Sequence, residues 1–286
     1  MKKIILDCNW LCYRSAFGMT SLSYENKSVH VVFDFIRQLL VLAEKFKCHD
    51  FVFCWDSRNS WRKVYSPEYK NNRHKDLTAE QAEDLADTYR QMDDLRNMVL
   101  PYMGFKNILY QSGYEADDLI AVAVDDLKAL DKHCTIVSSD EDLFQLLDIN
   151  VQLHNFKRNF RLSDFMEQYY SIKASQWAEV KAISGCPGDN VVGIKGVGDK
   201  TAAKYIAGIL KGKAKDTIES TEGCQIKAFN LPLVRLPYSG KKAIKKLEIV
   251  PDEISEDKFQ DMFGQYGFKS FLKEENWKKW EEAFEF

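Results

Sequence analysis

Several features that define other classes of protein are missing from this sequence of 286 residues. There is no CxxC pair, so a structural zinc site built on cysteine pairs is not expected. The seven cysteines are an odd number at irregular spacing, which is typical of reduced thiols in the cytosol rather than of a disulfide framework. No internal repeat or low-complexity segment is apparent.

Long uncharged hydrophobic runs are also missing. Asp7 interrupts the first apolar run too early for a secretory signal peptide. The most apolar helical segment, residues 29–46, contains Asp34, Arg37 and Glu44, which excludes a membrane span. We therefore expect a soluble, cytoplasmic protein that is a monomer and has no membrane partner.

A strong charge of one sign is missing as well, because 40 basic residues face 43 acidic ones and the net charge is −3. That total alone argues weakly against a nucleic-acid-binding protein. Seven of the acids, however, are grouped beside short apolar runs, and without them the remaining charge is about +4. The overall balance therefore does not exclude a nucleic-acid partner.

The grouped acids are the most informative feature of the sequence. Four of them follow short, β-branched or aromatic runs that predict buried strands, and three more precede the apolar-patterned helix that begins near residue 116. An acidic first helical turn can simply complement the helix dipole. In an open α/β sheet, however, ligands bind beyond the carboxyl ends of the parallel strands, so all seven would meet at one edge. The seven are Asp7, Asp56, Glu115, Asp117, Asp118, Asp140 and Asp142.

Seven carboxylates at one edge would need cations. Two like charges about 4 Å apart repel by roughly 4 kcal/mol at an effective dielectric of 20. Hard oxygen ligands without histidine favour Mg²⁺ or Mn²⁺ over zinc. The sequence therefore predicts a divalent-metal site.

Residues 57–75 have a different character. Six basic residues face a single acid, Glu68, and three aromatic residues lie between them. A basic run is usually a solvated surface, but interleaved aromatics favour phosphate neutralisation combined with base stacking. The basic residues are Arg58, Arg62, Lys63, Lys70, Arg73 and Lys75, and the aromatic residues are Trp61, Tyr65 and Tyr69.

The remaining pattern predicts an α/β fold with a mostly parallel central sheet flanked by helices. Ser28 is expected to cap a helix that ends near Phe46, and Thr78 to Gln81 fit a capping box that opens a helix to Met103. Strands are expected at residues 4–6, 51–55, 106–110, 135–138 and 151–156. The predicted domains are residues 1–174, with an inserted basic and helical arch at about 57–103, and a helical region at 175–286.

A second glycine-rich segment lies at residues 185–202. Gly196 and Gly198 flank an apolar residue directly before a helix start, where backbone N–H groups can approach a phosphate. Glycine–apolar–glycine alone is common in tight turns. Together with Lys195, Lys200 and Thr201, it predicts a helix–hairpin–helix clamp for DNA phosphates.

In combination, these motifs resemble the structure-specific 5′ nucleases, the flap endonuclease and 5′–3′ exonuclease family, and especially its small bacteriophage-type members. The resemblance covers nearly the whole chain. It implies hydrolysis of phosphodiesters near single-strand/duplex junctions of DNA (5′ flaps, nicked or gapped duplexes), with replication proteins as conceivable partners and, for a phage protein, the host cytoplasm as location.

The resemblance also implies roles for individual residues. Lys70 and Arg73 would contact the scissile phosphate at the base of the arch, beside the catalytic acids Asp118 and Asp140, and Tyr69 would stack on the terminal base. Arg14, Arg62 and Lys181 would bind the DNA backbone, the hairpin would hold duplex DNA, and a K⁺ ion could sit there. Two Mg²⁺ or Mn²⁺ ions would be surrounded by Asp7, Asp56, Glu115, Asp117, Asp118, Asp140, Asp142 and Asp189.

One position departs from the family pattern. The family commonly has an aspartate three residues before the position of Asp189, where this chain has Cys186. A neutral thiol suits Mg²⁺ poorly, which puts the second metal position in question. Two alternatives stay open: a PIN-like ribonuclease, which shares the acidic sheet edge, and a junction-binding protein with a weakened metal site. A dehalogenase-type phosphotransferase is disfavoured because Asn9 stands where it would need a second aspartate.

Overall fold

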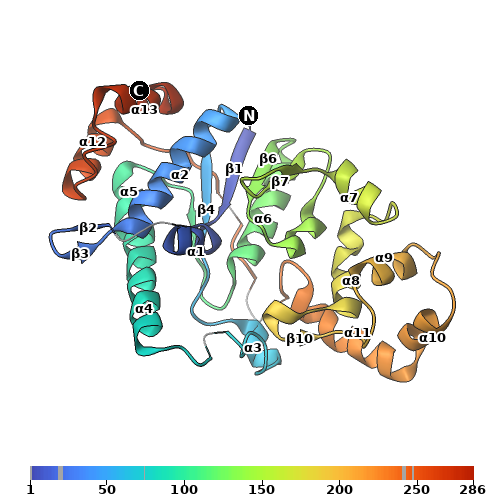
Figure 1. Cartoon of the computed structure of the whole chain (residues 1–286). Coiled ribbons are helices and arrows are strands. Elements are labelled where there is room, and N and C mark those ends of the chain that lie inside the picture. The colour runs from blue at the N-terminus through green and yellow to red at the C-terminus, as the bar shows by residue number, and fades with distance from the viewer. Residues whose placement is uncertain (1, 19–21, 74, 240–242, 247) are drawn as a thin grey trace. The chain divides into compact units, whose positions relative to one another are not determined.

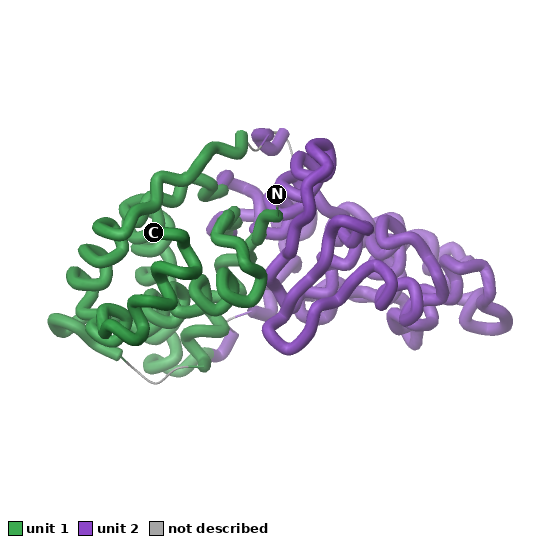
Figure 2. The backbone as a smooth tube through the Cα atoms, turned by 90° about the horizontal axis from the view of Figure 1, so that it is seen from above, with its two compact units in different colours: residues 1–55, 77–109, 248–286 green, residues 56–76, 110–247 purple. Residues whose placement is uncertain are grey.

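The computed structural model describes residues 2–18, 22–73, 75–239, 243–246 and 248–286 (Figure 1). The chain divides into two compact units (Figure 2). Unit 1 comprises Met1–Trp55, Leu77–Leu109 and Glu248–Phe286, and unit 2 comprises Asp56–Asp76 and Tyr110–Leu247. This grouping differs from the predicted boundary at residue 174: the last 39 residues lie with the first strands, and the segment expected to form an arch is shared between the units.

Unit 1 contains three parallel strands in the order β5-β4-β1. In the register, Ile5 lies beside Val52 and Phe53 beside Ile108, so apolar residues fill both faces. A short antiparallel pair, β2 with β3, precedes α2. The elements are β1 (Lys2–Asp7), α1 (Cys8–Gly18), β2 (Ser23–Tyr24), β3 (Lys27–Ser28), α2 (His30–Phe46), β4 (Phe51–Cys54), α4 (Ala79–Asp94), a π-helical turn (Leu95–Val99), α5 (Leu100–Met103), β5 (Ile108–Leu109), α12 (Glu256–Gln265) and α13 (Glu274–Phe284).

The core of unit 1 is aromatic. Phe53 and Phe105 meet edge to face with ring centroids 5.0 Å apart. Phe284 of the last helix lies 6.3 Å from Phe51 of β4 and 5.0 Å from Phe259 of α12. Each fully buried ring contributes about 1.5–3 kcal/mol of transfer free energy. The C-terminal aromatic residues therefore attach α12 and α13 to the strands, as the sequence predicts for a terminal helix packed on the core.

Unit 2 contains the parallel pair β6 and β7, extended by the antiparallel strand β8. Its core is built on Phe144, Phe160 and Trp177, and the first two rings are stacked with centroids 4.4 Å apart. The elements are α3 (Trp61–Tyr65), α6 (Ala116–Ala129), β6 (His133–Val137), a 3₁₀ segment (Glu141–Leu146), β7 (Val151–His154), β8 (Asn159–Phe160), α7 (Leu162–Gln168), a 3₁₀ turn (Ala174–Gln176), α8 (Trp177–Ser184), β9 (Gly185–Cys186), a 3₁₀ turn (Pro187–Asp189), β10 (Val191–Val192), α9 (Asp199–Ile206), α10 (Lys213–Glu219) and α11 (Thr221–Val234).

The predicted α/β class and the mostly parallel strands are confirmed, while some local expectations differ. The Thr78 capping box is present, with Gln81 N–H 3.2 Å from Thr78 Oγ1. Ser28 does not cap α2; its hydroxyl instead lies 2.8 Å from His30 Nδ1. Among the described residues, no helix is long and apolar enough to cross a membrane.

Candidate active site

Seven of the eight predicted acids belong to unit 2, and three of them act on one lysine, Lys70. Lys70 has a left-handed backbone conformation (φ 54°), and its N–H donates to the carbonyl of Asp189 at 2.8 Å. Its ammonium lies 2.9 Å from Glu115 Oε2 and 3.7 Å from Asp189 Oδ2. Asp56 is close enough to raise the pKa of Lys70 together with these two acids. Lys70 is therefore a half-buried counter-ion for three carboxylates.

The electrostatics of Glu115 follow from this arrangement. Burial alone would raise the pKa of its carboxyl, but Lys70 and Arg62, together with hydrogen bonds from Lys70 and Tyr69, lower that pKa to about 2. For Asp56, burial dominates and raises the pKa of the carboxyl, although its Oδ1 accepts the Ala116 N–H at 2.7 Å. The N-terminus of α6 thus binds the Asp56 carboxylate through the Ala116 N–H and has Glu115 as its N-cap residue.

Asp118 is placed differently from the other acids. It is fully buried, and the Arg62 guanidinium donates to both of its oxygens at 2.7 and 2.8 Å. The N–H groups of Glu115 and Tyr238 add bonds of 3.0 and 2.8 Å. With four donors, Asp118 has no capacity left for a metal in this structure, which differs from its expected role as ligand and catalytic acid.

Arg62 and Tyr69 also differ from expectation. Arg62 is 2% exposed, and besides Asp118 it donates to the Leu233 carbonyl at 2.7 Å, so it cannot reach a DNA backbone from this position. Tyr69 is 3% exposed, and its hydroxyl lies 2.9 Å from Glu115 Oε2 and 3.0 Å from Asp189 Oδ2. Its buried ring is not available to stack on a base. Both side chains hold the basic segment onto the acid cluster.

Arg73 is an exposed cation of the same segment that also contacts the acids. Its guanidinium lies 2.6 Å from Asp189 Oδ1, and its side chain is 45% exposed. It therefore combines an ion pair to the cluster with access to solvent, which agrees with the predicted position beside a phosphate.

A second group of acids follows β6. Asp140 Oδ1 accepts the Asp142 N–H at 2.8 Å and so begins the 3₁₀ segment. Burial and the neighbouring Asp140 raise the pKa of Asp142 to about 7, and burial raises the pKa of Asp140. Lys181 of α8 lies 3.7 Å from Asp142 Oδ1 and 3.5 Å from Asp199 Oδ2. The predicted phosphate ligand Lys181 is thus paired with acids in this structure.

Cys186 faces this group. Its Sγ lies 3.4 Å from Asp142 Oδ2, while the rest of the residue packs in an apolar cluster that includes Tyr69 and Val191. Burial, followed by Asp142, raises the pKa of the thiol, so it is a neutral S–H donor. The loop beside Pro187 therefore does not turn the thiol away from the acids.

The remaining predicted residues lie at three places. Asp117 is half-buried in the first turn of α6. Asp7, in unit 1, is 7% exposed and accepts the Trp10 N–H at 3.0 Å, and Arg14 is exposed on α1. The hairpin residues follow β10 in unit 2.

In the predicted hairpin region, α8 is followed by β9, a 3₁₀ turn, β10, the glycine-containing turn and then α9 (Figure 1). Gly196 has φ +79°, and a Cβ at Gly196 or Gly198 would meet no atom within 4 Å, so the backbone there is open. Lys195 and Lys200 are exposed, and Thr201 N–H donates to the Gly198 carbonyl at 3.0 Å. The N-terminus of α9 is therefore accessible to an anion.

Sequence reasoning missed the partners that fix this arrangement. The carbonyls of Leu233 and Arg235 and the N–H of Tyr238 come from the end of α11 and the residues after it. These are backbone groups, which carry no local sequence signal. Asp199 had a signal, as an acid in a first helical turn, but its pairing with Lys181 was not foreseen.

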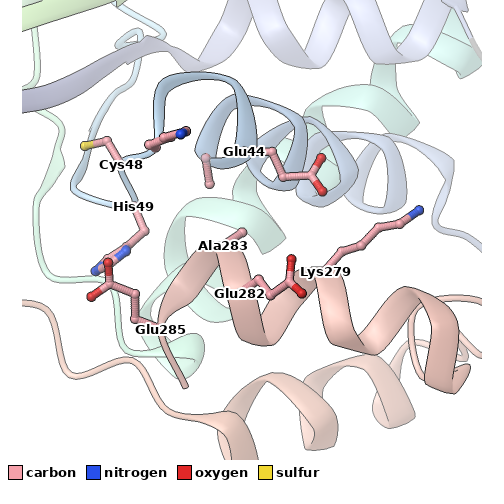
Figure 3. A pocket seen from close by; sticks show the side chains of 9 residues that line it. Glu44, Cys48, His49, Lys279, Glu282, Ala283 and Glu285 are labelled. Atoms are coloured by element: carbon pink, nitrogen blue, oxygen red, sulfur yellow. The ribbon is translucent and has the colours of Figure 1, made fainter.

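A separate pocket of about 370 Å³ lies in unit 1 between the end of α2 and α13 (Figure 3). Its lining is of mixed charge, with Glu44, His49, Lys279 and Glu282 among the residues. No predicted site residue lines this pocket.

Comparison with known proteins identifies the family. The family model for the 5′-3′ exonuclease N-terminal resolvase-like domain matches residues 2–174. DNA polymerase I of Deinococcus radiodurans is 31% identical over 71% of this chain and 20% of its own length, and that of Caldicellulosiruptor bescii is 25% identical over 96% and 33%. The chain thus spans a third or less of these relatives.

Among solved structures, a bacteriophage T5 flap endonuclease crystallised with DNA and metal ions is 23% identical. The similarity covers 93% of this chain and 100% of that chain, with a TM-score of 0.71, and it establishes a shared fold. With the family model matching well over half of its length, the chain belongs to the 5′–3′ exonuclease family.

Proposed function

We propose that this protein is a divalent-metal-dependent 5′ nuclease that hydrolyses phosphodiesters of DNA near single-strand/duplex junctions. The observation that carries the proposal is the cluster of buried and half-buried carboxylates in unit 2, in a chain of this family. Flap endonuclease activity and DNA are named for the T5 protein with the same fold, and they are extended to this chain here.

The donor set fits a hard divalent cation. The potential ligand atoms are carboxylate oxygens. The carboxylates outnumber the cations Lys70, Arg73 and Lys181 that face them. Burial raises the pKa values of Asp56, Asp140 and Asp142, so their charged forms are disfavoured without further positive charge. A divalent ion would supply that compensation.

The cluster as described is held by protein cations. Among the described residues, no three His, Cys, Asp or Glu side chains are placed so as to hold a metal ion. Metal binding therefore needs carboxylates to move away from Lys70 and Lys181. The residues that would hold Mg²⁺ or Mn²⁺ are Asp56, Glu115, Asp140, Asp142 and Asp189, with Asp7 and Asp117 as further predicted ligands and two ions as the expected number.

The contacts suggest separate roles in the reaction for the metal and for the basic side chains. When bound, the metal would lower the pKa of an attacking water and stabilise charge on the phosphate. Lys70 becomes available to a phosphate oxygen once Glu115 is engaged elsewhere, and Arg73 already reaches solvent. Arg62 and Asp118 act indirectly, because their buried pair fixes the segment that carries both cations.

The hairpin would bind the duplex. Exposed Lys195 and Lys200 and the open backbone at Gly196 and Gly198 would contact phosphates of one strand, and Thr201 adds a hydroxyl. A K⁺ ion at this turn stays part of the proposal, as does Arg14 as a further phosphate contact. Unit 2 would then contain both the duplex-binding hairpin and the carboxylate cluster.

A second candidate, a protein that binds junctions without cleaving them, is favoured by one observation. The acids are already paired with lysine and arginine, and Cys186 stands beside Asp142 in place of an oxygen ligand. This candidate predicts binding that does not depend on a divalent metal and is followed by no products.

The deciding assay uses a panel of end-labelled substrates with Mg²⁺, Mn²⁺ or EDTA. The panel contains 5′-flap DNA, nicked and gapped duplex, blunt duplex, and the matching flap in RNA. We expect metal-dependent cuts near the junction of the DNA flap. Cleavage of RNA alone would favour the PIN-like ribonuclease, and binding without products would favour the junction-binding protein.

The compartment, the assembly state and the partners are the remaining parts of the proposal. All seven cysteines are free thiols, which suits the reducing cytoplasm. A monomer acting alongside replication proteins, in a bacterial or phage-infected cytoplasm, is the arrangement that we propose.

A further inference from the structure

An exposed aromatic pair in unit 2 takes no part in the carboxylate cluster. Tyr65, the last residue of α3, stacks on Phe229 of α11 with ring centroids 5.4 Å apart and planes 29° apart. The Tyr65 hydroxyl lies 3.3 Å from the Phe229 carbonyl oxygen, and the two residues are 42% and 50% exposed. The pair is therefore a fixed ring surface that faces solvent.

Further apolar surface accompanies the pair. Val64, beside Tyr65 in the chain, is 64% exposed, and Val192 of β10 is 77% exposed. Asn230, which follows Phe229, donates to the Val192 carbonyl at 2.9 Å and so holds β10 beside α11 (Figure 1). Exposed apolar side chains from three elements in one region are typical of a binding surface.

The charge of the segment that carries Tyr65 indicates what the pair binds. Two cations of this basic segment, residues 57–75, are neutralised: buried Arg62 by Asp118 and half-buried Lys70 by Glu115. The other cations of the segment, Arg58, Lys63, Arg73 and Lys75, are exposed. An exposed ring on a segment that also carries exposed cations matches the two parts of a nucleotide, a flat base and a phosphate.

The same features favour a single-stranded nucleic acid over a duplex. A base inside a duplex has both faces covered by its neighbours, so it cannot stack on a protein ring without being unpaired. An unpaired base has a free face, and stacking on an aromatic side chain contributes about 1–3 kcal/mol. Of the three aromatic residues in the segment, Tyr65 is the exposed one, since Tyr69 is buried and Trp61 is half-buried.

We propose that Tyr65 and Phe229 form a stacking subsite for an unpaired base of a single-stranded nucleic acid. The segment runs only five residues from Tyr65 to Lys70, so a strand on the pair would continue toward the carboxylate cluster. The inference rests on the proposed function, because it assumes that a nucleic acid is the ligand. It adds a site for the single-stranded arm that is separate from the hairpin.

The test uses DNA with a single-stranded 5′ arm that carries 2-aminopurine at successive positions. Binding is measured in EDTA, so that no cleavage occurs, with blunt duplex of the same length in parallel. For the parent protein we expect a fluorescence change at one or two adjacent arm positions. Tyr65→Ala and Phe229→Ala should abolish this change and weaken binding of the armed DNA about 5-fold to 150-fold, while duplex affinity stays unchanged.

Two controls keep the result specific. Tyr65→Phe retains the ring and should behave like the parent. Tyr102→Ala removes a tyrosine of similar exposure, 44%, from α5 of unit 1 and should leave arm binding unchanged. Thermal melts of all variants show whether each is folded.

The outcomes separate the inference from the proposed function. If the parent binds armed DNA but Tyr65→Ala and Phe229→Ala bind it equally well, the subsite is refuted and the pair is better explained as a protein-binding surface. Equal losses for armed and blunt DNA would also refute it. If the parent binds neither DNA, the proposed function itself fails.

Discussion

The ion pair between Asp118 and Arg62 is closed off from solvent, with the two side chains 0% and 3% exposed. Both oxygens of the carboxylate and both terminal nitrogens of the guanidinium are used, and the pair joins α6 to α3. Such a pair costs desolvation energy to form, but removing one partner leaves an uncompensated buried charge. Its role is therefore to fix the position of the basic segment.

Asp118→Ala should consequently destabilise the fold by about 3–5 kcal/mol, because Arg62 is left buried without its partner. Urea unfolding measures this loss. Asp125→Ala, at an exposed position of the same helix, is the matched control and should change stability by less than about 0.5 kcal/mol. Equal stability of the two variants would show that the pair does not hold the segment.

Asp142 predicts a pH dependence. In the unfolded chain its carboxyl titrates near 3.8, and in the folded protein burial and Asp140 raise its pKa to about 7. Between these values the folded state keeps a proton that the unfolded state has released, so stability falls as pH rises from about 4 to about 7. In EDTA, Asp142→Asn should reduce this slope. A parent and variant with parallel profiles would contradict the account.

Cys186 tests whether the cluster accepts a further charge. Cys186→Asp places a carboxylate against Asp142, so in EDTA the melting temperature should fall through like-charge repulsion and burial. Adding Mg²⁺ should raise the melting temperature of this variant more than that of the parent. Cys186→Ser, which keeps a neutral donor, is the control. A lowered melting temperature with no added response to Mg²⁺ would show that the cysteine is purely structural.

At the scale of elements, the periodic patterns were predictable and the long-range partners were not. The capping box at Thr78 was predictable because both partners lie within four residues of each other. The helix expected to reach Met103 does so, but it includes a π-helical turn at Leu95–Val99 that no residue pattern predicted. The burial of Arg62 depends on Asp118, 56 residues away, and on carbonyls beyond residue 230. A basic run alone cannot show which of its members will be buried.

Two elements of unit 2 should have separable roles. Lys200→Ala, in the hairpin, should weaken duplex binding and reduce the slope of log affinity against log salt by about one. Lys70→Ala should slow cleavage more than it weakens duplex binding, because its ammonium lies among the acids. Single-turnover rates and binding isotherms at several salt concentrations measure both. A Lys70→Ala variant that lost only affinity, with Lys200→Ala losing only rate, would reverse the assignment.

At the scale of the whole molecule, the chain resembles a complete chain in the T5 structure but only a third or less of the polymerase relatives. The carboxylates come from several separate places in the sequence and meet in unit 2, apart from Asp7 in unit 1. The central claim is that this cluster performs metal-dependent hydrolysis. Asp140 is the most direct probe, because in this structure it is neither locked in an arginine pair, as Asp118 is, nor bound to Lys70, as Glu115 is.

The decisive measurement is the single-turnover rate of 5′-flap DNA cleavage by the parent and by Asp140→Ala across a range of Mn²⁺ concentrations. The account predicts a parent rate that saturates with metal and a variant rate at least about 100-fold lower, with binding of the DNA in EDTA retained. Cleavage by Asp140→Ala within a few-fold of the parent would contradict the assignment of the cluster as the catalytic centre.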